Sequence, residues 1–413
     1  MAIQATADQG LIRKLNIAII LDILRRFAPL SRAELAARTG MNRSTVSIIV
    51  NSLIEEGFVQ EADLQSSKIG RPGMLLVLNN KGGFAIGVEI GVNFISVILT
   101  DFTANILWRQ RVCTDLLKDQ ILIIDRASEL TQKAVEVGTE ENLRPLGIGV
   151  GVPGLVDTAR GRLIFAPNLH WNNVPLRLMW SQRFDLPIFV ENEANAAALG
   201  EYYFGVARGV DNFVYLSAGI GLGGGVMIDG KLFRGSRGYA GEVGHMTVDP
   251  EGDLCGCGKR GCWETKVGAR ALIGGVQNTL ANDTHSLIYD LVGGDLTQIT
   301  TDVVVEAARS GDSVSIKALE NVGKYLGIGV VNLINIFNPE LIVLGGALSL
   351  ANEFLLSAIE NTVCESALKP SCEGIQFAAS AHGEDACVMG AVALVLDDIL
   401  REPMFLPRVA WSS

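Results

Sequence analysis

The sequence predicts an α/β protein in which a small N-terminal helix-turn-helix module precedes a larger body. Three observations support this prediction. Capped helical segments joined by a glycine turn fill residues 11–57. A unit of strand, glycine-containing turn and strand occurs twice in the body, about 130 residues apart. The charge is uneven, because residues 1–80 hold nine Lys and Arg against seven Asp and Glu, whereas the whole chain of 413 residues has a net charge of −11.

The composition places the chain among globular proteins. It is 48% hydrophobic and 19% charged, which excludes a largely disordered chain and provides enough apolar material for a core. The apolar stretches are interrupted well before the ~20 residues that a membrane span needs, and the N-terminus lacks the pattern of a cleavable leader. We therefore expect a cytoplasmic protein without membrane insertion. A mildly basic head on an acidic body indicates two modules with different partners.

The first two helices are defined by periodicity and capping. Apolar side chains recur at helical spacing over residues 11–27, and Pro29 ends the pattern. Ser31 and Glu34 form a capping-box pattern at the start of a second helix. This second helix is expected to stop at Gly40, because glycine favours a turn at the end of a helix.

A third helix follows the glycine turn, is capped by Asn42 or Ser44 and continues to Gly57. Two short helices joined by such a turn form a helix-turn-helix. Val46 and Ile49 would face inward, whereas the first residues of the helix would point outward. Their short polar side chains and one Arg suit base edges and phosphates at the start of a recognition helix.

Two expected strands, residues 58–61 and 74–78, flank a Gly-Arg-Pro-Gly tip at residues 70–73, which is typical of a wing. An Arg on a stiff tip could enter a narrow A·T-rich minor groove. A small helical packing domain with a solvated charged face is the alternative, but the agreement of turn, caps and wing favours binding of double-stranded operator DNA. The candidate DNA contacts are Arg32, Asn42, Arg43, Ser44, Thr45, Ser47 and Arg71.

The body begins with a strand, turn and strand over residues 84–107, and residues 212–233 repeat the plan. The repeat predicts a duplicated α/β unit with a cleft between two lobes. The second copy carries a glycine-rich run at residues 219–225. Such a run is a weak sign of phosphate binding, since tight packing or a hairpin also accounts for it.

Three cysteines lie close together at positions 255, 257 and 262. With His245 they supply three sulfur ligands and one nitrogen ligand, which suits tetrahedral Zn²⁺ in a closed structural site. Buried free thiols are the alternative, but the density of cysteines and the flanking glycines favour a metal. The other cysteines lie in apolar contexts and are predicted to pack in the core; they are Cys113, Cys364, Cys372 and Cys387.

Five stretches together resemble the ROK family of sugar kinases and sugar-responsive repressors, over essentially the whole chain. They are Gly219–Gly225, Gly238–His245, Cys255–Glu264, Glu191–Asn195 and Leu344–Ser349. The winged head resembles the repressor branch, whose members respond to sugars such as xylose and N-acetylglucosamine. The resemblance implies an actin-like ATPase fold for the body, which is the hexokinase-like, duplicated ribonuclease H-like architecture. A winged head on a two-fold operator also leads us to expect a homodimer or homotetramer.

The chain departs from the kinases of the family in three places. Where the kinases begin with Asp-x-Gly-Gly-Thr, this chain has the longer carboxylate Glu89 and the side chains of Val92 and Asn93. Ile220 replaces the Thr of a Gly-Thr-Gly pattern, and Glu193 replaces the Asp that acts as general base. In-line phosphoryl transfer tolerates little displacement, so these changes predict a protein that is not an enzyme and has no catalytic residues.

By the same resemblance, a monosaccharide would be bound by Asn168, Asn192, Glu193, Glu242, His245 and Glu264. Such side chains supply the donors and acceptors that sugar hydroxyls need. Taken singly, Asn192 could instead cap a helix, Asn168 could form a turn and Glu264 could be a solvated charge. His245 would serve both sites, with one ring nitrogen on zinc and the other on a sugar hydroxyl. The identity of the sugar stays open, although the longer Glu193 narrows the site and favours a smaller sugar such as xylose.

The resulting hypothesis is a sugar-responsive DNA-binding regulator, most simply a repressor of carbohydrate-utilisation genes that a monosaccharide releases. One alternative is an ATP-dependent sugar kinase with a DNA-binding head, and another is a regulator sequestered by a membrane sugar transporter. The expected domains are a winged helix-turn-helix at residues 1–80, a first lobe at 84–200 and a second lobe with the zinc knuckle at 201–413. Residues 81–83 would form the hinge, and the C-terminal helices could return to the first lobe.

Overall fold

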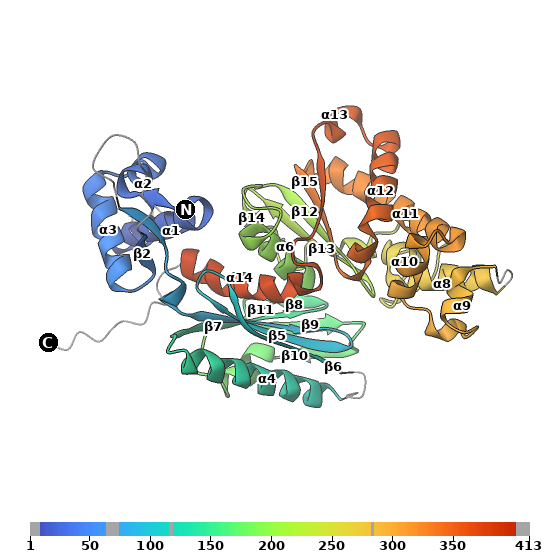
Figure 1. Cartoon of the computed structure of the whole chain (residues 1–413), viewed down its shortest axis with the longest axis horizontal. Coiled ribbons are helices and arrows are strands. Elements are labelled where there is room, and N and C mark those ends of the chain that lie inside the picture. Colours follow the sequence, from blue (N-terminus) through green and yellow to red (C-terminus); the bar gives the residue numbers. More distant parts are fainter. Residues whose placement is uncertain (1–8, 63–73, 115–118, 282–284, 402–413) are drawn as a thin grey trace, which may run out of the picture. The chain divides into compact units, whose positions relative to one another are not determined.

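The computed structural model describes residues 9–62, 74–114, 119–281 and 285–401 (Figure 1). The chain forms two compact units that are discontinuous in sequence. Of the described residues, unit 1 contains the head, the chain from there to residue 150, and residues 177–189 and 391–401, and unit 2 contains residues 151–176 and 190–390. These units divide the body differently from the expected break near residue 200, because segments far apart in sequence pack together. Among the described helices, none has the length and apolar character needed to cross a membrane.

The head contains three helices, namely α1 (Gln9–Phe27), α2 (Arg32–Thr39) and α3 (Arg43–Glu55). The expected capping box is present, since the Ser31 hydroxyl accepts from the Glu34 backbone and Glu34 accepts from the Ser31 backbone. Gly40 ends α2 in the left-handed conformation at φ +69°, and the Asn42 side chain caps α3. The predictions of these three helices and their turn are confirmed.

A three-stranded antiparallel sheet completes the described part of the head. Its order is β1-β3-β2, with β1 (Leu30–Ser31), β2 (Val59–Ala62) and β3 (Leu75–Leu78). The two strands expected around the wing are therefore confirmed, whereas the two-residue β1 was not anticipated. The predicted tip at residues 70–73 lies outside the described residues.

The Lys-Gly-Gly hinge expected between head and body is packed tightly. Gly82 and Gly83 are buried, and Gly83 has a φ of +147°. The Arg144 Nε donates a hydrogen bond to the Gly82 oxygen at 2.7 Å, and the guanidinium carbon lies 3.8 Å from the centre of the Phe58 ring. The Phe58 ring in turn packs on that of Phe102, with centroids 5.0 Å apart. The glycines therefore permit a close approach to Arg144 rather than free rotation.

The main sheet of unit 1 has the order β11-β7-β4-β5-β6. Its strands are β4 (Phe84–Ile90), β5 (Phe94–Asp101), β6 (Ile106–Cys113), β7 (Pro145–Val152) and β11 (Ile188–Asn192), and the last two cross the boundary of the units. The associated helices are α4 (Gln120–Glu140), α5 (Leu176–Ser181) and α14 (Ala386–Arg401). A Cβ at Gly149 of β7 would overlap the backbone of Ala391, so α14 crosses this strand in close contact.

The main sheet of unit 2 has the order β14-β13-β12-β15-β16. Its strands are β12 (Phe213–Ala218), β13 (Leu222–Ile228), β14 (Lys231–Leu232), β15 (Leu341–Gly345) and β16 (Gln376–Ala379). In each sheet an antiparallel three-strand unit is extended by two strands from later in the chain. The matching orders confirm the duplicated α/β plan.

Unit 2 also holds a small antiparallel sheet of order β10-β9-β8. Its strands are β8 (Leu155–Asp157), β9 (Arg162–Ala166) and β10 (Trp171–Val174). The helices of the unit are α6 (Glu193–Phe204), α7 (Glu264–Val267), α8 (Ala269–Leu280), α9 (Leu287–Leu291), α10 (Thr301–Arg309), α11 (Ser313–Phe337), α12 (Asn352–Ser366) and α13 (Lys369–Cys372). Short 3₁₀ turns complete the described chain at Asn80–Gly82, Val243–His245, Leu296–Gln298, Ala347–Ala351 and Gly383–Asp385.

The prediction that the scattered cysteines pack in the core holds for Cys387, which is buried, and is wrong for two others. Cys113 and Cys364 are exposed. Cys113 ends β6, an edge strand along which exposed and half-buried residues alternate, and Cys364 lies on the outer side of α12. An apolar sequence context does not fix which face of an edge strand or a surface helix a residue occupies.

Candidate functional site

The glycine-rich hairpin between β12 and β13 brings three of the expected sugar-binding side chains together. A Cβ at Gly221 would lie 2.6 Å from the Glu264 Oε2 and 3.6 Å from the Asn168 Nδ2. A Cβ at Gly223 would lie 3.8 Å from the Glu193 Oε1. Glycine at position 221 therefore leaves the space that the Glu264 carboxylate occupies, and glycine at position 223 leaves space for the Ala194 Cβ, 2.9 Å away, next to Glu193. This close packing explains part of the glycine run, and phosphate binding is not needed to account for it.

Three carboxyl groups, Glu193, Glu242 and Glu264, form what we call the carboxyl cluster. Burial raises the pKa of Glu193 to about 7, and repulsion from Glu242 and Glu264 contributes to the rise. Burial also raises the pKa of Glu242. Carboxyl groups held this close supply many acceptor atoms, and the proton that one of them retains near neutral pH supplies a donor.

His245 lies between the carboxyl cluster and the cysteines. Its Nε2 is 3.9 Å from the Glu242 Oε2. Its Nδ1 is 3.6 Å from the Glu264 Oε1 and 3.6 Å from the Cys255 Sγ. The two ring nitrogens therefore face different groups, as required if one binds a metal and the other a ligand hydroxyl.

Asn192 is engaged as a helix cap, which was the alternative to sugar binding. Its side-chain oxygen accepts from the backbone of Ala194 at 2.9 Å and of Asn195 at 3.1 Å. Its Nδ2 donates to the Gly154 oxygen at 3.0 Å. The side chain thus fixes the start of α6, next to Glu193, and retains one N–H for a ligand.

An ion pair between a buried carboxylate and a half-buried arginine, close to Glu193 in the sequence, was not foreseen. Glu191 is 1% exposed and accepts a hydrogen bond from the Arg234 Nε at 2.7 Å. The same carboxylate accepts from the Asn195 Nδ2 at 3.3 Å. Because Arg234 also accepts from the Ala240 backbone through its carbonyl oxygen, the pair ties the start of α6 to the loop that leads to Glu242. The sequence places Glu191 in a recognised motif, but nothing in it marks Arg234 as the partner.

The candidate metal centre is formed by His245, Cys255, Cys257 and Cys262. One ligand atom from each residue lies within 4.8 Å of all the others. The Cys257 and Cys262 sulfurs are 3.7 Å apart, and the Cys255 thiol donates to the Glu264 Oε1 at 2.7 Å. Three sulfurs and an imidazole nitrogen that converge in this way fit a metal ion.

The outward face of α3 carries most of the expected DNA contacts. Asn42, Arg43 and Ser44 are exposed, and Thr45 and Ser47 are half-buried. The expected contact Arg32 differs from the others, because it donates to the Glu61 carboxylate at 2.7 Å and to the Asn51 oxygen at 3.1 Å. Arg71 lies outside the described residues. Ile48 was not singled out from the sequence, yet it is the most exposed large apolar residue described on α3, at 65%.

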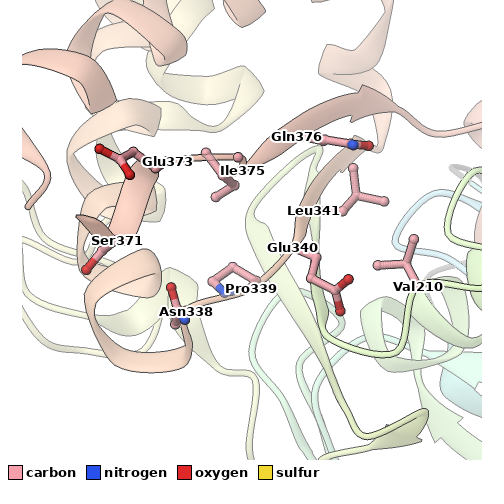
Figure 2. A pocket seen from close by; sticks show the side chains of 10 residues that line it. Val210, Asn338, Pro339, Glu340, Leu341, Ser371, Glu373, Ile375 and Gln376 are labelled. Atoms are coloured by element: carbon pink, nitrogen blue, oxygen red, sulfur yellow. The ribbon is translucent and has the colours of Figure 1, made fainter. Parts of the chain in front are cut away.

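A separate cavity of about 260 Å³ opens beside β15 and β16 (Figure 2). Glu340, Gln376 and Glu373 line it together with Asn338 and the apolar Val210. None of the residues predicted for the sugar, metal or DNA sites is among those that line it. We assign it no role.

The carboxyl cluster predicts a pH dependence of stability. Because the pKa of Glu193 is raised to about 7 in the folded protein, the folded state holds more protons than the unfolded state between pH 4.5 and 7. The free energy of unfolding should therefore fall by about 2 kcal/mol as the pH rises through this window. Urea unfolding at pH 5 and 8 tests this, with Glu193→Gln expected to remove most of the fall. An equal fall in wild type and variant would contradict the assignment.

Comparison with known proteins gives two family matches. The ROK family pattern matches residues 85–398, and the IclR helix-turn-helix domain matches residues 17–63. The xylose repressor of Caldicellulosiruptor bescii is 35% identical over 398 residues, which cover 96% of this chain and 99% of the relative.

Two solved structures extend the comparison. The crystal structure of a ROK family transcriptional regulator, a homolog of the Escherichia coli Mlc protein, has a TM-score of 0.82 and 27% identity, over 95% of this chain and 97% of that one. The ROK family glucokinase from Streptomyces griseus, solved with glucose and AMPPNP, has a TM-score of 0.68 and 34% identity, over 76% of this chain and 99% of that one. The match to the regulator covers nearly the whole chain and therefore includes the head. The match to the glucokinase covers 76% of the chain, which is close to the fraction that the body makes up.

Proposed function

This chain belongs to the ROK family, and on that premise we propose that it is a DNA-binding transcriptional repressor that a monosaccharide releases from its operator. One observation carries the proposal, namely that the chain matches a named xylose repressor over nearly the full length of both. The combination of a helix-turn-helix head with the carboxyl cluster in the body agrees with it. In a protein with both parts, binding of a sugar to the body can change the affinity of the head for DNA.

The monosaccharide would be bound by the carboxyl cluster together with Asn168 and His245. Carboxylates accept from sugar hydroxyls, while the Asn168 amide and the His245 Nε2 can donate to them. Asn192 would act mainly by fixing the position of Glu193, with its remaining N–H available to the sugar. The extra methylene of Glu193 relative to Asp favours a smaller sugar, and a pentose such as xylose agrees with the name of the similar repressor.

We assign Zn²⁺ to the candidate metal centre, with His245 Nδ1 and the three cysteine sulfurs as ligands. Bound zinc would hold the loop between Thr247 and Cys262 to the rest of unit 2 and would fix the His245 tautomer. The Nε2 would then carry the proton and donate on the side of Glu242. In this way the metal centre would orient one of the sugar-binding side chains.

On the DNA side, α3 would act as the recognition helix, and two heads of a homodimer or homotetramer would bind two half-sites. Arg43 and Ser44 are exposed at its N-terminus, where a helix in the major groove meets bases and phosphates. Sugar binding would favour a conformation of the protein that binds the two half-sites less well. The wing, with Arg71, would add a contact in the minor groove.

The similarity to a glucokinase supports a second candidate, a sugar kinase with a DNA-binding head. We favour a regulator without enzymatic activity, because Glu89, Val92 and Asn93 replace residues of the kinase phosphate motif. Ile220 and Glu193 also differ from the kinase pattern. Incubation with ATP and xylose, glucose or N-acetylglucosamine tests this choice. Formation of ADP at about 10 s⁻¹, a median enzyme rate, would establish the kinase instead.

The experiment that tests the repressor uses the full chain and an operator that the protein itself selects from random double-stranded DNA. Fluorescence anisotropy would follow binding to this operator while xylose, glucose or N-acetylglucosamine is added. We expect one sugar to release the DNA without any other protein. If no sugar releases the operator and a membrane sugar transporter does, the protein is a sequestered regulator, and the proposed sugar response is wrong.

Arg43→Ala should weaken operator binding without changing sugar affinity. Loss of one phosphate or base contact from an exposed arginine costs about 1–3 kcal/mol, or roughly 5- to 150-fold in affinity. Operator titrations at two salt concentrations give the affinity and its salt dependence, which should also become less steep. Arg270→Ala, an exposed arginine on α8, serves as the matched control and should bind like wild type. Equal operator affinity of Arg43→Ala and wild type would remove Arg43 from the interface.

A further inference from the structure

Ile48 occupies an unusual place on α3. Its side chain is 65% exposed, although the opposite face of the helix is almost fully buried. Val46, Ile49 and Val50 are at most 3% exposed and pack into the head. This packing fixes the rotation of α3 about its axis, so Ile48 projects away from the core.

Three polar neighbours of Ile48, namely Ser44, Ser47 and Asn51, have partners within the head. The Ser44 hydroxyl donates to the Asn42 Oδ1 at 2.7 Å, and the Ser47 hydroxyl donates to the Arg43 oxygen at 2.8 Å. The Asn51 oxygen accepts from Arg32 at 3.1 Å. These side chains are short or held by such bonds. Of the neighbouring groups, Ile48 is therefore the one that projects as an apolar surface.

The major groove of DNA presents one apolar group on a base edge that an apolar side chain such as Ile48 can contact. Donors and acceptors of the base edges require polar partners, whereas the C5-methyl group of thymine is apolar. Ile48 is β-branched, so its side chain has little rotamer freedom to lose when it is buried against a methyl group. It also lies one helical turn after Ser44, within the first half of the helix, where recognition helices contact bases.

We propose that Ile48 contacts the C5-methyl group of one thymine in each operator half-site and so helps to set the sequence that the repressor recognises. The inference rests on the proposed function, since it assumes that α3 enters the major groove. It assigns sequence discrimination to an apolar contact, while Arg43 supplies affinity through charge. Removal of either the isoleucine side chain or the thymine methyl group should have the same effect, and removal of both should add nothing further.

The test combines a change in the protein with a change of a single methyl group in the DNA. The operator is the one that the wild-type full chain selects from random double-stranded DNA. Each thymine is replaced in turn by deoxyuridine, which lacks only the C5-methyl group. For wild type, we expect one position in each half-site at which deoxyuridine lowers affinity about fivefold. Ile48→Ala should bind the thymine and deoxyuridine operators equally, and Ile48→Val should retain part of the difference.

Ile336→Ala provides the matched control, because Ile336 is 64% exposed on α11 and lies in unit 2. It should show the wild-type dependence on the methyl group. If Ile48→Ala keeps the full dependence, or if no deoxyuridine position affects wild type, the assignment of Ile48 is wrong while the repressor function stands. A change of oligomeric state in Ile48→Ala would also overturn it, by placing Ile48 in a protein interface. Failure of wild type to select any DNA sequence would instead overturn the proposed function.

Discussion

Glu193→Gln is expected to produce a protein that stays on its operator at sugar concentrations that release wild type. Glu193 lies at the first position of α6, beside the glycine hairpin and within the carboxyl cluster. Glutamine has the same size but cannot carry the negative charge that strengthens hydrogen bonds from sugar hydroxyls. Hydrogen bonds to a charged group contribute about 1.5–3 kcal/mol, so we expect sugar affinity to fall roughly 10- to 150-fold.

Calorimetric titration of the sugar and anisotropy with labelled operator measure the two affinities separately. Operator affinity without sugar should match that of wild type, because Glu193 and the head lie in different units. Glu320→Gln, at an exposed position on α11, is the matched control and should respond to sugar like wild type. Release of Glu193→Gln at wild-type sugar concentrations would show that the sugar is bound elsewhere.

Cys257→Ser should remove the metal and lower the melting temperature by about 5 °C or more, the shift that a loss of a few kcal/mol produces. In the loop between Thr247 and Cys262, Val248 packs against the core of unit 2, but Leu254 is 64% exposed. The backbone bridges of Thr247 with Cys262 and of Leu254 with Arg260, together with other backbone hydrogen bonds, link its two ends. Convergent metal ligands would therefore supply much of its stability.

Cys257 is the informative ligand to change, because Cys255 also donates to Glu264 of the carboxyl cluster. Elemental analysis of the purified full chain would report zinc, and a thermal melt would report stability. We further expect a weaker sugar response, since His245 would lose the orientation that the metal provides. Cys364→Ser, at an exposed cysteine on α12, should keep metal, stability and response. Unchanged zinc content in Cys257→Ser, or wild type purified without zinc, would contradict the assignment.

Features that depend on neighbours along the chain could be predicted from the sequence. The capping box of Ser31 and Glu34 and the left-handed Gly40 involve residues within a few positions of one another, so the residue types alone define them. The antiparallel unit of β12, β13 and β14 is likewise local, because short turns join the strands. The cysteine cluster was visible for the same reason, since its three sulfurs come from within eight residues of the sequence.

The candidate sugar site could be predicted only in part. The motifs pointed to Glu193, Glu242 and Glu264. The structure buries Glu193, which raises its pKa, and places the other two carboxyl groups close enough to add to the rise. The motifs did not show that the Asn192 side chain would be used as a cap. They also did not pair Glu191 with Arg234, because the pair joins residues 43 positions apart and only the folded chain brings them together.

By itself the sequence determined the helix-turn-helix, the duplicated strand units and the candidate set of metal ligands, because each is encoded by spacing and by interactions over short distances. The tertiary structure decided that the glycine hinge is packed against Arg144, which lies 62 positions after Gly82. It also decided that Cys113 and Cys364 face solvent and that Ile48 projects from α3. Exposure and long-range pairing depend on how all the elements pack together, and no local pattern of residue types contains that information.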